Sequence, residues 1–123
     1  MSDFDHERLE VYKRTLDFVV AADAIRKELP AGHRALADQL DRAAVSIALN
    51  IAEGAGEFAP REKARFYRIA RRSATECAAI LDVAARLDLV DQAQIASAKE
   101  QLRVIVAMLV VMGRRKENQK PEP

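Results

Sequence analysis

The sequence predicts an all-α protein, an antiparallel up-down-up-down bundle of four helices. Apolar residues recur at spacings of three and four along most of the 123-residue chain, which is the pattern of one helix face. The four Pro residues lie where helices are expected to begin or end, or in the C-terminal tail. The joints between the helices are short, and short joints favour antiparallel neighbours.

The first helix is expected from about residue 7 to residue 29. Its apolar face is formed by Leu9, Tyr12, Leu16, Val19 and Val20. Pro30 and Gly32 should break it.

The second helix is expected from about residue 34 to residue 53. Its inner stripe comprises Leu36, Leu40, Ala43, Ala44, Ile47 and Ile51. Gly54 and Gly56 should end it, because glycine accepts the left-handed conformation.

The third helix should start near Pro60, a residue suited to the first helical position. One side of it carries Phe66, Ile69, Ala70, Ser73, Cys77, Ile80, Ala84 and Leu87. The fourth should start at Asp91, with Gln94 completing a capping box. Its seam comprises Ile95, Ala98, Leu102, Ile105, Leu109 and Met112. We therefore expect one bundle domain over residues 7–113, a flexible N-terminus over 1–6 and a disordered polar tail over 114–123.

The bulk properties exclude several classes of protein. The formal net charge is +1, so any binding to nucleic acid must come from a local patch. The single Cys77 allows no intrachain disulfide and no metal cluster, which fits the cytoplasm. The longest apolar run, residues 104–112, is about half of what spans a bilayer. We expect no membrane partner, no cofactor, no metal and no catalytic residues.

Two helices have more apolar surface than a monomeric bundle needs. Val45 and Leu49 point away from the inner stripe of the second helix, and Val104, Val106, Val110 and Val111 surround the seam of the fourth. Large exposed apolar patches mark interfaces, so the sequence predicts a homo-oligomer. The alternative is that both helices lie centrally and the extra residues pack against the loops.

A motif in the second helix resembles a known family. The residues are Gln39-Leu40, Arg42-Ala43-Ala44, Ser46-Ile47 and Asn50-Ile51-Ala52-Glu53-Gly54. They are similar to the signature of the four-helix bundle proteins named for intervening sequences in 23S ribosomal RNA. The resemblance implies a left-handed antiparallel bundle, often a ring of five subunits, without established enzymatic activity. A relative in diversity-generating retroelements is thought to bind nucleic acid and a reverse transcriptase.

This chain departs from the family pattern at three positions. Asp41 and Glu57 stand where basic residues are common, and Arg72 replaces a Gly. The two acidic residues lower the positive charge near the second helix. They weaken the expectation of nucleic-acid binding through that helix.

Polar residues of the motif are expected to form a buried or interfacial network that fixes the helix register. Its members are Arg42, Ser46, Asn50, Glu53, Ser73 and Glu76. With the hairpin turning near residues 54–60, Arg42 should lie near Ser73 and Glu76, and Glu53 near Arg61 and Arg65. The simpler alternative for Glu76 is an intrahelical pair with Arg72. A ligand or enzyme site around Asn50, Glu53 and Glu76 is a third, weaker reading.

Arg61, Arg65, Arg68 and Arg72 recur at spacings of four, three and four, and so form one basic ridge on the third helix. Lys63, Arg71 and the basic tail add charge nearby. A ring of subunits would multiply this ridge into a belt that binds RNA or DNA phosphates. The alternative is a solvated face that neighbouring acids balance.

The leading interpretation is thus a non-enzymatic, homo-oligomeric assembly or adaptor module, a pentamer by resemblance, whose partner is itself or another protein. The competing interpretation is a nucleic-acid-binding accessory protein.

Overall fold

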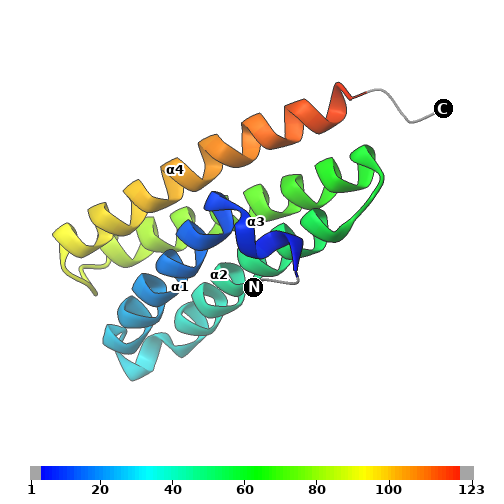
Figure 1. Cartoon of the computed structure of the whole chain (residues 1–123). Coiled ribbons are helices and arrows are strands. Elements are labelled where there is room, and N and C mark those ends of the chain that lie inside the picture. The colour runs from blue at the N-terminus through cyan, green and yellow to red at the C-terminus, as the bar shows by residue number, and fades with distance from the viewer. Residues whose placement is uncertain (1–3, 120–123) are drawn as a thin grey trace.

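The computed structural model describes residues 4–119, which fold into four α-helices (Figure 1). The helices are α1 at Glu10–Glu28, α2 at Arg34–Gly56, α3 at Pro60–Arg86 and α4 at Gln92–Glu117. Short 3-10 turns precede the first two: η1 at Asp5–Arg8 and η2 at Ala31–His33. No strand occurs between residues 4 and 119. The prediction of an all-α, four-helix protein is confirmed.

Each helix packs on its neighbours in the sequence, and α4 returns to contact α1. The diagonal pairs α1–α3 and α2–α4 lie further apart, and within residues 4–119 no Cα atoms of these pairs come within 8 Å of each other. Three cross-links show the directions: Ser46 meets Ser73, Arg68 meets Glu117, and Asp82 meets Lys99. In the last two pairs the residue number rises along α4 as it falls along α3. α3 and α4 therefore run in opposite directions, and the colours of Figure 1 show the same for the other successive pairs.

The buried face of α1 differs from the predicted one. Val11, Thr15, Phe18, Ala22 and Ile25 are buried, whereas Leu16 is 43% and Val20 71% exposed. Leu9, Tyr12 and Val19 are only partly buried at the edge of the core. α1 carries two apolar stripes, and the prediction selected the outer one. The hydroxyl of Thr15 is satisfied inside the core by donating to the carbonyl of Val11 at 2.7 Å.

The predicted inner stripes of the other helices are largely correct. In α2, Leu40, Ala43, Ala44, Ile47 and Ile51 are buried, and Leu36 packs at the edge. In α4, Ile95, Ala98, Leu102, Ile105 and Leu109 are buried. In α3 the exception is Leu87, which is 52% exposed just beyond the helix end. Cys77 is a core residue, and burial raises the pKa of its thiol to about 12.

Helix α2 does not end at Gly54 as predicted but continues to Gly56. No glycine between residues 4 and 119 has a positive φ, so the left-handed cap is absent. Gly54 is instead required by packing. A Cβ atom at Gly54 would lie 2.7 Å from Cε1 of Tyr67 and 3.1 Å from Cβ of Phe66. The glycine lets the buried Tyr67 ring of α3 approach the backbone of α2.

The joint between α3 and α4 holds the one residue in the described range with a positive φ outside glycine, Asp88 at 56°. The amide of Leu89 donates to the carbonyl of Ala84, and that of Asp88 to Ala85. This is a Schellman motif with aspartate at the position that glycine usually takes. Asp91 precedes α4 without a side-chain capping bond, so the predicted capping box with Gln94 does not form.

Helical elements reach into both of the predicted ends. Asp5–Arg8 form η1, and α4 extends through the first four residues of the predicted tail, Arg114–Glu117. Residues 1–3 and 120–123, which belong to the predicted flexible ends, lie outside the described residues.

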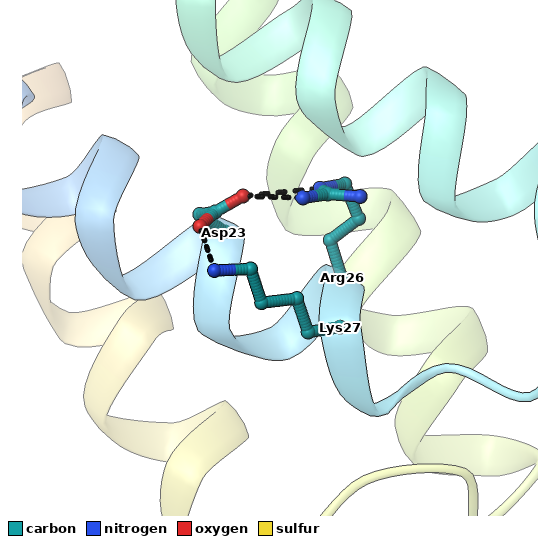
Figure 2. A network of polar contacts seen from close by, with 3 residues as sticks. All are labelled: Asp23, Arg26 and Lys27. Carbon is teal, nitrogen blue, oxygen red and sulfur yellow. Dashed lines mark hydrogen bonds and ion pairs between the residues drawn. The ribbon is translucent and has the colours of Figure 1, made fainter.

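Charged side chains form ion pairs along the last turn of α1 (Figure 2). The carboxylate of Asp23 accepts a hydrogen bond from Nη2 of Arg26 at 2.7 Å and pairs with Nζ of Lys27 at 3.0 Å. These bonds, that of Arg26 first, hold the pKa of Asp23 below its usual value. The pKa of Arg26 is raised, first by its bond with Asp23 and further by the charges of Asp41 and Asp38. The end of α1 therefore lies beside the start of α2.

Candidate functional surfaces

Three of the predicted network residues meet between α2 and α3. The hydroxyls of Ser46 and Ser73 are 2.9 Å apart. Asn50 donates from Nδ2 to the carbonyl oxygen of Ser46 at 2.9 Å and to its hydroxyl at 3.1 Å. All three side chains are half-buried, so their bonds fix the level of α2 against α3 without burying charge.

The three charged members of the network do not join it within one chain. Arg42, Glu53 and Glu76 are exposed, and within the described residues none of them forms an ion pair. The register of the hairpin also differs from the predicted one. Ser73 was expected near Arg42 but lies opposite Ser46, about one turn further along α2.

The same register separates Glu53 from Glu76, the two carboxylates of the predicted ligand or enzyme site. With Ser46 opposite Ser73, Glu76 lies level with residue 43, which is ten residues of helix from Glu53. At 1.5 Å per residue this is about 15 Å. A shared site for Asn50, Glu53 and Glu76 is therefore not formed in one chain.

Lys63 has a role that the sequence reasoning missed. Its Nζ donates to the carbonyl oxygens of Gly54 at 3.1 Å and Ala55 at 2.9 Å. Carbonyls in the last turn of a helix lack an intrahelical partner, and a cation at that end is favourable. Burial, with the charge of Lys116 second, lowers the pKa of Lys63. The sequence did contain a signal for this role, because Lys63 lies one turn into the helix that follows the end of α2.

The outer side of α1 and α2 carries exposed apolar residues. On α1, Leu16 and Val20 are 43% and 71% exposed, and on α2 Val45 and Leu49 are 37% and 60% exposed. Leu9 shares a cavity with Ala55, which sets the level of the two antiparallel helices. At that level residues 16 and 20 lie beside residues 48 and 44. These four exposed residues on neighbouring helices are called the α1–α2 apolar face.

The predicted ridge of α3 is present, and part of its charge is paired. Arg65 pairs with Glu62 at 3.2 Å and lies over the ring of Phe66, and Arg68 reaches Glu117 of α4 at 3.2 Å. Arg61 and Arg72 are exposed and form no ion pair within residues 4–119. These four arginines are called the α3 ridge.

Charge is distributed unevenly between the helices, although the net charge is only +1. α3 contains seven Lys and Arg against three Asp and Glu, and α4 contains five against two. α2 contains two against three. One side of the bundle is therefore basic, and the opposite side is neutral to acidic.

The described residues include no group of three or more His, Cys, Asp or Glu side chains that could hold a metal ion. Within residues 4–119, no helix is both long enough and apolar enough to cross a membrane.

Comparison with known families matches residues 7–111 to the family described as 23S rRNA-intervening sequence protein. The chain belongs to this family. The resemblance of the motif in α2 is thereby confirmed. Among solved structures, this chain is similar to a protein of unknown function from the S23 ribosomal protein family of Bacteroides thetaiotaomicron. The two share 21% identity with a TM-score of 0.77, over 85% of this chain and 98% of that chain. Such low identity shows the fold alone. No curated protein matches this sequence.

Proposed function

We propose that this protein is a non-enzymatic assembly module whose copies associate head to tail through the α1–α2 apolar face. The observation that carries the proposal is the exposure of Leu16, Val20, Val45 and Leu49 on two neighbouring helices. Single exposed apolar side chains are normal, but a grouped set bordered by charge is typical of an interface. By the family resemblance we take the closed assembly to be a pentamer.

The pattern along α2 favours a second copy of this chain as the partner. Asp41, Val45, Leu49 and Glu53 are spaced by four and are all exposed, so two apolar residues are flanked by two acids. An interface with an apolar centre and a polar rim is the usual arrangement. The partner surface should therefore be apolar and basic.

The outer face of α3 offers such a surface. Residues 61, 72 and 83 are eleven apart, just over three turns, so they lie nearly along one line. The line begins with the α3 ridge and ends with Val83 and Leu87, which are 45% and 52% exposed. Because the two faces differ, their contact is heterologous and generates a ring when the rotation closes. Across it, Glu53 of one copy can pair with Arg61 or Arg65 of the next.

Substitution of Leu49 by Arg tests this contact. The side chain is exposed, so the fold should remain while the mass in solution falls toward that of one chain. Val111→Arg is the matched control, because Val111 is 47% exposed on α4 and lies outside both faces. An assembly that Leu49→Arg leaves intact would refute the α1–α2 apolar face as the contact.

A second candidate function is binding to nucleic-acid backbone by the basic side formed by α3 and α4. The uneven charge of these helices favours it, and phosphate contacts would make binding salt-dependent. A filter-binding titration with duplex and single-stranded DNA and RNA tests it. Replacement of Arg61, Arg65, Arg68 and Arg72 by Glu should abolish binding. Equal binding by this variant would exclude the ridge.

A further inference from the structure

A groove between α3 and α4 near the C-terminal end of the described chain has the character of an anion site. Its volume is about 170 Å³. The charged residues that line it are Arg68 and Arg71 of α3 with Arg114 and Glu117 of α4. The lining thus contains three arginines and one carboxylate. Its floor includes Ala64, Tyr67, Leu109 and Gly113.

The charges in this groove are not balanced within the chain. Glu117 pairs with Arg68 at 3.2 Å, whereas Arg71 and Arg114 form no ion pair within residues 4–119. Like charges that line one groove repel one another, and an anion between them reduces that repulsion. The planar guanidinium fork fits the oxygens of a phosphate better than a lysine does.

Gly113 gives a second, independent observation. It lies inside α4, where glycine costs about 0.5–1 kcal/mol relative to alanine. A Cβ atom there would meet nothing within 4 Å, so no packing in the chain requires the glycine. Gly54 differs, because the Tyr67 ring occupies its side-chain space. Because Gly113 lines the groove and has no side chain, the groove stays open at this position, which suits a ligand.

We propose that this α3–α4 groove binds the phosphoryl group of a small phosphorylated ligand. Arg71 and Arg114 bind the phosphoryl oxygens, and Arg68 exchanges its bond with Glu117 for one with the ligand. Glu117 is therefore a competing internal anion. The volume suits one phosphoryl group with a small substituent rather than a polymer. The site lies within one chain, on the α4 flank of α3.

Calorimetric titration with inorganic phosphate and with pyrophosphate tests the proposal. The wild-type chain should bind one anion per groove. Arg71→Ala and Arg114→Ala should each weaken binding by about tenfold or more. Glu117→Gln should strengthen it several-fold, because the competing carboxylate is removed. Arg72→Ala is the matched control, because Arg72 follows Arg71 but does not line the groove.

Gly113→Leu provides a variant that keeps every charge. Its side chain should fill the groove and abolish anion binding while the melting temperature remains that of a folded bundle. Three outcomes would overturn the proposal. The first is the absence of saturable binding of either anion up to about 10 mM, where affinity would be negligible. The second is unchanged binding by Gly113→Leu or Arg71→Ala. The third is binding of a DNA or RNA duplex through this groove without binding of either small anion.

Discussion

Replacing Gly54 by alanine should destabilise the bundle, although the same change usually stabilises a helix. The new Cβ atom would lie 2.7 Å from Cε1 and 3.0 Å from Cδ1 of Tyr67, and 3.1 Å from Cβ of Phe66. Tyr67 is only 3% exposed, so its ring has little room to move. Overpacking of this kind costs about 1–3 kcal/mol.

The helix preference of alanine over glycine opposes this cost by about 1 kcal/mol. Since three atoms lie at or below 3.1 Å, we place the packing cost in the upper part of its range. The expected net loss in free energy of unfolding is about 1–2 kcal/mol. Urea unfolding followed by circular dichroism, at one fixed chain concentration, measures it.

Gly113→Ala is the matched control, because this glycine is also helical and nothing lies within 4 Å of its Cβ position. That variant should gain about 0.5–1 kcal/mol. In a Tyr67→Val background, where the ring is absent, Gly54→Ala should no longer destabilise. If Gly54→Ala stabilises wild-type protein as much as Gly113→Ala does, the packing explanation for Gly54 is wrong.

Three further predictions concern single side chains. Ser46→Ala should lower the free energy of unfolding by about 0.5–1.5 kcal/mol, and adding Ser73→Ala should cost less than it does alone, as a double-mutant cycle would show. Asp88→Gly should raise stability by about 0.5–1 kcal/mol in urea unfolding, because the left-handed backbone strains a non-glycine residue. Cys77 should react with a thiol reagent only on unfolding. Since burial raises its pKa from 9.0 to about 12, the contribution of Cys77 to stability should be full below pH 9 and be lost between pH 9 and 12, and Cys77→Ala should show a smaller decline over that range.

The sequence predicted the helices well because their apolar periodicity is long and strong. The number of helices, the start of α3 at Pro60 and the buried stripes of α2 and α4 all follow from that pattern. α1 was harder, since Leu16 and Val20 lie on an apolar stripe as regular as that of Val11 and Phe18. Periodicity does not show which of two stripes faces the other helices.

The end of α2 and its polar network depended on tertiary contacts. Gly54 resembled a helix stop, yet its role is to admit the ring of Tyr67. The error moved the expected register of the hairpin by about one turn. Short polar residues still met, because Ser46 and Ser73 lie near the interface. The pairs of Glu53 with Arg61 or Arg65 were not recovered within one chain, and they remain a prediction for contacts between chains.

The mass of the protein in solution tests the proposed assembly most directly. Light scattering coupled to size exclusion, at low and high salt, should give a multiple of 13.7 kDa, five by the family resemblance. The value should survive high salt, because the centre of the proposed contact is apolar. A monomer at both salt concentrations would contradict the assembly and leave the α1–α2 apolar face without its proposed partner.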